Sequence, residues 1–257
     1  MKKLIALVLS VSAFSAFANT HCSTLGCPTG APSNNDVIER SIYKMSSNRS
    51  TKLTDWVAYK VTPNTIDGPS RSRSWRADPA ISSRYTLEPD DYRDANAVIR
   101  TDRGHQVPLA SFSNTADWSQ TNYLSNITPQ ASNLNQGPWV RLENAVRAHV
   151  RTGESVYVIT GPLYEYFFAN LPRANERHTV PSGYFKVVMT ISNTGWIEAS
   201  GFIMEQDAGR RDDFCRTEVT IDEIESRTGL NLLPAMPSYI ERSVERRLGG
   251  MTREMGC

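Results

Sequence analysis

What most restricts the folding of this chain is that its four cysteines follow an export signal. Lys2 and Lys3 precede an apolar run over 4–17, which closes with a small-x-small tripeptide at 16–18. These features are typical of a secretory signal peptide, which we expect over residues 1–18. An N-terminal anchor helix is the alternative, but the run of about 14 residues is shorter than the roughly 20 that span a bilayer. We therefore predict a secreted (extracellular) or periplasmic protein with no membrane segment after cleavage.

The cysteine count is even, which in an exported chain favours disulfides. Cys22 and Cys27 are close enough in sequence to pair, and Cys215 would then pair with Cys257. A zinc site is a weaker alternative, because the sequence contains no Cys-x-x-Cys pair and His21 is the only histidine nearby. Proximity thus predicts one bridge in the lead-in segment and a second that ties the last residue to the body of the protein.

The charge balance excludes one broad class of nucleic-acid-binding protein. The chain has 28 basic and 27 acidic residues, and loss of the two leader lysines brings the basic count to 26. With 39% hydrophobic residues and a mean hydropathy of −0.42, the composition is that of an ordinary globular protein. A protein with this balance cannot hold a polyanion by its overall charge, so any site for one must be local.

Strand patterns dominate the chain, and a few helices accompany them. Apolar runs predict strands over 56–61, 155–160, 184–191 and 196–204. An apolar stripe at helical spacing predicts the strongest helix over 135–152, a capping-box pattern predicts another over 220–229, and 117–123 is a short helix candidate. No linker divides the chain. We predict a single α+β domain over 19–257.

The run from Asp102 to Pro108 carries the first chemical signal. His105 lies two residues after Arg103, and glycine and proline flank the histidine. Histidine is the side chain best suited to take a proton near neutral pH, and arginine prefers phosphate or carboxylate oxygens. A surface turn with a hydrated histidine explains the same residues equally well.

Amide side chains crowd the segment 122–139, and amide oxygens are neutral ligands for hard cations. At 100° per residue, Asn135 lies within about 20° of two apolar residues of the predicted helix, so it faces the core side. The alternative makes Asn135 the helix N-cap and makes Glu143 and Arg147 a solvated i,i+4 pair. The pattern alone leaves both interpretations open.

The run 102–105, followed by Asn135 and Glu143 on a helix, resembles the DNA/RNA non-specific endonuclease family. These are the ββα-metal or His-Me finger nucleases, and the likeness is greatest to the secreted Serratia-type sugar-non-specific nucleases. The resemblance covers the whole mature chain, including both later cysteine positions. Further matching segments are 27–30, 56–59, 78–80, 122–130, 134–137, 160–165 and 220–229.

The resemblance implies roles for individual residues. His105 matches the general base, and Asn135 matches the sole direct protein ligand of a divalent cation, usually Mg²⁺, with Mn²⁺ or another divalent ion as a substitute. Glu143 matches a position that holds metal-bound water. Arg73 matches an arginine on the scissile phosphate. Supporting catalytic positions are matched by Arg103, Asn126 and Arg147, of which the two arginines also count as substrate contacts.

The resemblance also implies a fold and an activity. It predicts an antiparallel sheet flanked by helices, with the active site on a ββα-metal motif. The expected reaction is hydrolysis of DNA and RNA to 5′-phosphorylated oligonucleotides. Because the net charge is near zero, we expect the nucleic acid to bind a local arginine-rich face around Arg71, Arg73 and Arg76. A homodimer is compatible with the family.

Three departures from the family pattern lie outside the matched catalytic residues. Val107 replaces an expected alanine, the Cys22–Cys27 loop is one residue longer, and 166–177 follows no familiar pattern. Two other function classes remain as alternatives. One is a catalytically silent protein that binds nucleic acid or glycan, which the joint presence of His105, Asn135 and Glu143 disfavours. The other is a phosphodiesterase of narrow specificity on the same scaffold.

Overall fold

The computed structural model describes residues 21–22 and 25–257. The signal peptide predicted over 1–18 lies outside the described residues. Within the described part of the chain, no helix has the length and apolar character needed to cross a bilayer.

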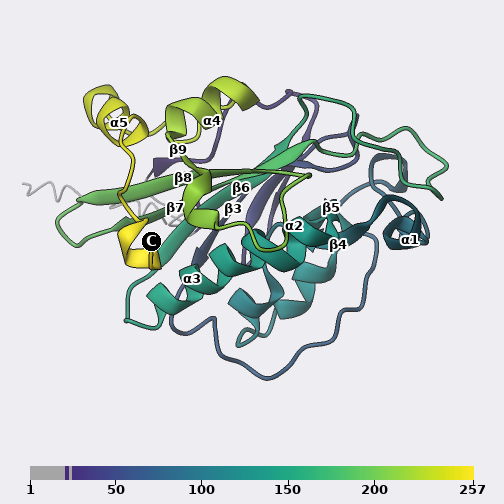
Figure 1. Ribbon diagram of the computed structural model, residues 1–257, viewed down its shortest axis with the longest axis horizontal. Helices are drawn as coiled ribbons and strands as arrows, with labels where there is room; N and C mark the ends of the chain where they lie inside the picture. The colour runs from purple at the N-terminus through teal and green to yellow at the C-terminus, as the bar shows by residue number, and fades with distance from the viewer. Residues whose placement is uncertain (1–20, 23–24) are drawn as a thin grey trace, which may run out of the picture.

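A seven-stranded antiparallel sheet forms the middle layer of the molecule (Figure 1), in the order β1-β2-β3-β6-β7-β8-β9. Its strands are β1 (Asp36–Glu39), β2 (Lys44–Ser47), β3 (Thr54–Val61), β6 (Val156–Leu163), β7 (Gly183–Ile191), β8 (Ile197–Glu205) and β9 (Glu218–Val219). The four longest confirm the strands predicted from apolar runs, with bounds that differ by three residues at most. The predicted α+β class is confirmed.

Helices cover both faces of this sheet, and each face has its own core. The helix α3 (Val140–Val150) packs on one face, and α4 (Ile221–Thr228) and α5 (Ser238–Glu245) pack on the other (Figure 1). Along β7, Tyr184 and Val188 join the α3 core, whereas Phe185 and Val187 join the other core. Because both faces are covered, the central strands are apolar almost throughout rather than alternating with polar residues.

A separate two-stranded sheet carries the histidine motif. Strand β4 (Thr101–His105) pairs antiparallel with β5 (Ile127–Ala131), and His105 lies opposite Ile127. The chain then runs directly through α2 (Ser132–Leu134) toward α3, which completes a β-β-α arrangement. The surface-turn interpretation of the 102–108 run is therefore wrong for its first four residues, which form a paired strand.

The helix predicted over 135–152 is broken near its start. Helical structure begins at Ser132, passes through a wide π-type turn over Asn135–Trp139, and becomes regular from Val140. Gly137 has non-helical angles there, φ −115° and ψ −117°. A Cβ at this glycine would lie 2.7 Å from the carbonyl oxygen of Arg210, so only glycine fits where this distant loop approaches the turn. The prediction of Asn135 as the N-cap is wrong.

The remaining elements are the helix α4, two disulfides and several short helices. Helix α4 confirms the capping-box prediction, since the Thr220 side chain accepts from the Glu223 amide and Gly229 ends the helix at φ 73°. Disulfides join Cys22 to Cys27 and Cys215 to Cys257, with Cα–Cα distances of 4.8 and 5.6 Å, as proximity predicts. The other short helices are α1 (Ala95–Ile99) and 3₁₀ turns at Ser83–Tyr85, Leu109–Phe112, Trp118–Asn122, Leu124–Asn126, Phe214–Thr217 and Arg253–Met255.

Candidate active site

A cleft of about 700 Å³ lies at the ββα motif, where β4 and α3 meet the segment that precedes α1. Six of the seven residues singled out for chemistry line it: Arg73, Arg103, His105, Asn135, Glu143 and Arg147. Residues from four separate parts of the sequence therefore converge on one cavity. The seventh, Asn126, does not line the cleft and is described below.

A hydrogen bond fixes the orientation of the His105 imidazole. His105 Nε2 lies 3.4 Å from Asn122 Oδ1, and the Asn122 amide nitrogen donates to the Ser72 carbonyl at 3.0 Å. With its nitrogen so occupied, Asn122 presents an oxygen to the histidine, which makes Nε2 the protonated nitrogen. The lone pair of the neutral ring is then on Nδ1. The Trp75 ring, 5.3 Å away between centroids, packs against the imidazole.

The surroundings of His105 keep its ring neutral. The pKa of His105 is lowered from 6.5 to about 4, first by burial and then by the positive charge of Arg73, while the hydrogen bond with Asn122 opposes both. At neutral pH the imidazole therefore carries no proton on Nδ1 and is able to accept one.

A carboxylate orients the amide of Asn135. Asp102 Oδ2 accepts from Asn135 Nδ2 at 2.9 Å and from Gln136 Nε2 at 2.8 Å, while Oδ1 accepts from Ser132 Oγ and Asn96 Nδ2. Although partial burial opposes it, these bonds hold the pKa of Asp102 below its ordinary value. The nitrogen of Asn135 is thereby fixed on Asp102, which leaves its carbonyl oxygen to serve as a neutral ligand for a hard cation.

Glu143 lines the cleft above a lysine that the sequence did not single out. Burial raises the pKa of Glu143, and the charges of Lys186 and Arg147 oppose that rise. Lys186 is fully buried, with its Nζ 4.2 Å from the ring centroid of Trp139 and 3.4 Å from the Tyr59 hydroxyl. Burial lowers the pKa of Lys186 to about 8. The carboxylate thus has a cation on its inner side.

Two of the cleft arginines are held in place by protein contacts. Arg103 donates from Nη2 to the Pro89 carbonyl at 3.1 Å, and its guanidinium lies 5.5 Å from the Tyr92 ring centroid. Arg147 is 7% exposed and donates to Ser111 Oγ and Asn144 Oδ1. The interpretation of Arg147 as a solvated partner of the preceding turn of helix is therefore wrong.

The three arginines of the predicted basic face, Arg71, Arg73 and Arg76, lie in different surroundings. Arg71 donates to the Ser113 carbonyl at 2.8 Å and covers the Trp118 ring, 5.0 Å from its centroid. Arg76 is likewise held, over the Tyr123 ring and on the Ser119 carbonyl. Of these three arginines, only Arg73 lines the cleft.

Asn126 does not line the cleft. Its side chain is fully buried, with Oδ1 accepting from the Val107 amide at 2.8 Å and Nδ2 donating to the carbonyls of Val107 and Thr121. The structure therefore places Asn126 as a brace for the backbone that follows His105, and not where it could touch a substrate.

Sequence reasoning missed three residues that shape the site. Asn122 carried a usable signal, because it belongs to the amide-rich segment 122–139. Trp75 and Lys186 carried none, since each is brought to the cleft by contacts between distant strands and loops.

Comparison with known proteins agrees with the chemistry that the cleft suggests. The model of the family described as DNA/RNA non-specific endonuclease matches residues 24–238. A nuclease from Serratia marcescens is 41% identical to this chain, and the match covers 99% of this chain and 97% of that nuclease. Human mitochondrial endonuclease G is 30% identical over 80% of this chain and 72% of its own. A crystal structure of the EndoG/EndoGI complex has the same fold, with a TM-score of 0.67 at 23% identity over 79% of this chain and 87% of that chain.

The cleft combines a neutral histidine, which accepts a proton, with an oriented amide oxygen and a carboxylate, which suit a hard cation. Its three guanidinium groups are hydrogen-bond donors for phosphate oxygens. This combination suits hydrolysis of a phosphodiester and agrees with the matches along the sequence. The chain belongs to the DNA/RNA non-specific endonuclease family.

Proposed function

We propose that this protein is an exported endonuclease that cuts DNA and RNA to 5′-phosphorylated oligonucleotides with one Mg²⁺ ion. The observation that carries the proposal is the neutral His105, held by Asn122 in the same cleft as Asn135 and the arginines. The signal peptide expected over 1–18 and the two disulfides support export, to the periplasm or to the medium.

In the proposed reaction, His105 Nδ1 takes a proton from a water molecule. The water oxygen forms a bond to phosphorus as the bond from phosphorus to the 3′-oxygen breaks. The 3′-oxygen leaves and takes up a proton from solvent, so the products are a 5′-phosphate and a 3′-hydroxyl. A general base of this kind contributes about 10²–10⁴-fold to the rate.

The donor set around Asn135 fits a hydrated Mg²⁺ ion. Asn135 would hold the ion through its carbonyl oxygen, and Glu143 would bind the water around it, since Mg²⁺ usually keeps several waters and takes few protein ligands. When bound, the ion supplies neutralising charge to the phosphoryl oxygens and the leaving 3′-oxygen. Mn²⁺ satisfies the same oxygen donors and should substitute for it.

Arg73, Arg103 and Arg147 are proposed to bind backbone phosphates. Phosphate contacts position a strand and carry no sequence information, so neither base nor sugar should be selected. Arg73 is best placed for the scissile phosphate, because its charge acts directly on His105.

Digestion of plasmid DNA and of RNA by the purified mature chain, with Mg²⁺ and with excess chelator, tests the proposal. We expect both substrates to be cut only with the ion and the products to be ligatable through a 5′-phosphate. The His105→Ala variant should lose most cleavage and still bind DNA. Cleavage that persists in chelator, or turnover confined to mononucleotides, would refute the proposal.

A further inference from the structure

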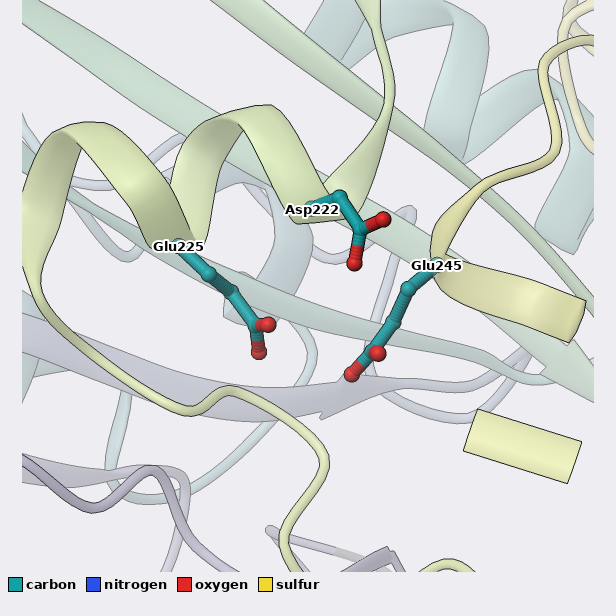
Figure 2. A group of neighbouring side chains, drawn as sticks. All are labelled: Asp222, Glu225 and Glu245. Atoms are coloured by element: carbon teal, nitrogen blue, oxygen red, sulfur yellow. The ribbon is translucent and has the colours of Figure 1, made fainter. Parts of the chain in front are cut away.

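On the sheet face opposite the cleft, α4 and α5 bring three carboxylates together. Asp222 and Glu225 come from α4 and Glu245 from the last turn of α5, and their side chains converge on a common space (Figure 2). One oxygen from each lies within 4.8 Å of the others. Acidic clusters are common on surfaces, so this grouping alone identifies no site.

The burial of Glu245 sets this cluster apart. Glu245 is 5% exposed, and its Oε1 is buried with no hydrogen-bond partner within the described part of the chain. A buried, unpartnered carboxylate oxygen is costly unless a cation or a proton compensates it. Burial first, and then the negative charges of Glu225, Glu241 and Asp222, raise the pKa of Glu245 to about 7.

The Glu245 carboxylate lies at hydrogen-bond distance from that of Glu225, so a shared proton or a cation has to lie between the two. Glu225 Oε1 accepts from the Leu232 amide at 2.6 Å, and Glu241 accepts from the Asn231 side chain. Among the described ion pairs, one involves the cluster, between Arg246 Nε and Asp222 at 3.0 Å. The Arg246 side chain is 69% exposed, so water screens its charge. Within the described residues, these contacts therefore supply no cation between the inner oxygens of Glu245 and Glu225.

We propose that Asp222, Glu225 and Glu245 form a structural Ca²⁺ site that fastens α5 to α4. The donors are all carboxylate oxygens, which favours a hard cation over zinc or copper. Opposed ligands of Ca²⁺ lie about 4.6–5.2 Å apart, twice the metal–oxygen distance, and those of Mg²⁺ about 4.0–4.2 Å. The carboxylate oxygens, all within 4.8 Å of one another, fit around Ca²⁺, and Ca²⁺ accepts irregular coordination by carboxylates better than Mg²⁺ does.

The experiment separates this site from the cleft by working in an Asn135→Ala background. Equilibrium dialysis with ⁴⁵Ca²⁺ at pH 8, where Glu245 is ionised, compares that protein with its Glu245→Gln derivative. We expect the derivative to lose one bound equivalent. Glu254→Gln, an equal charge change outside the cluster, should lose none. Binding that is equal in all three proteins would overturn the proposal, whatever the nuclease assays show.

Thermal melting supplies a second readout that does not depend on the cleft. Ca²⁺ at about 100 times its Kd should raise the Tm of the Asn135→Ala protein by roughly 5–10 °C at pH 8. In chelator, Glu245→Gln should melt higher than its parent, because the substitution removes repulsion, and Ca²⁺ should add nothing to it. If Ca²⁺ leaves the parent unchanged, while its Tm rises as the pH falls through 7, then a shared proton holds the cluster and the Ca²⁺ proposal fails.

Discussion

At the scale of single residues, the active site depends on which proton each group carries. Arg73→Met should raise the pKa of His105 above its value of about 4 and leave it below the ordinary 6.5, because burial, the larger cause, remains. NMR titration of the His105 ring in metal-free protein measures this directly. Arg71→Met is the matched control, since Arg71 is held on Trp118. Equal titration curves for both variants would contradict the proposed placement of Arg73.

The same two arginines give a kinetic prediction. Arg73→Ala should lower kcat more than it raises KM, and by a similar factor on duplex DNA and single-stranded RNA, because charge on the phosphate oxygens grows toward the transition state. Arg71→Ala should have a weak effect that fades with added salt. Steady-state kinetics of both variants at two salt concentrations test this. A loss confined to one sugar type would contradict recognition through the backbone.

Asp102 is predicted to act through Asn135. In the Asp102→Asn variant, the new side-chain amide can either donate to or accept from Asn135. The Asn135 amide is then free to turn, and its carbonyl oxygen loses its fixed direction toward the ion. Loss of such an orienting partner typically costs about 10–100-fold in metal affinity, which Mg²⁺ titrations followed by calorimetry and by activity would both detect. Asn96→Ala, which removes a bond to the other carboxylate oxygen, serves as the control. Identical metal affinity in all three proteins would exclude this role.

At the scale of elements, the strand β7 places a lysine in a row of core residues. Burial lowers the pKa of Lys186 from 10.5 to about 8, so below pH 8 the folded protein bears the cost of a buried charge that the unfolded chain does not. Stability should therefore rise as the pH increases from 8 toward 10.5. Lys186→Met should raise the Tm below pH 8 and flatten that rise.

Melting curves across this pH range test the role of Lys186, with Lys60→Met on β3 as a control for simple charge loss. Lys186→Met should also affect the active site, since Glu143 loses the cation on its inner side. Its pKa should rise further, which moves the acid limb of activity to higher pH. If Lys186→Met left the pH dependence of both melting and activity unchanged, the charge of Lys186 would have no effect on stability or on Glu143.

Elements whose signal is local were predictable from the sequence, and those set by distant contacts were not. The long strands and α4 were predicted correctly, because apolar runs and capping residues are patterns of neighbouring residues in the sequence. The β4–β5 pair was not predicted, because its strands are polar and β5 contains Pro129. The break at Gly137 was not predicted, because the close approach of the loop at Arg210 joins residues that are distant in the sequence. Within the site, His105 and Asn135 follow from motif and resemblance, whereas the buried partner of Glu143 requires the register of β7.

At the scale of the whole molecule, the two disulfides should contribute unequally to stability. The bridged residues are 42 apart for Cys215–Cys257 and 5 apart for Cys22–Cys27. Loss of chain entropy in the unfolded state gives about 4 kcal/mol for the longer loop and about 2 kcal/mol for the shorter. Paired-serine variants should therefore differ in Tm, with the larger drop on removal of the longer loop. Equal drops in calorimetry would contradict this.

The two outer strands of the sheet have a consequence for how the protein behaves in concentrated solution. Strand β1 is four residues long and begins and ends with carboxylates, at Asp36 and Glu39, and β9 has only two residues. A long, flat outer strand would offer unpaired amides and carbonyls to any passing chain, and so would template aggregation. These short, charged outer strands offer little for another chain to pair with. A sheet with such edges should therefore aggregate little when the protein is heated and cooled repeatedly at high concentration.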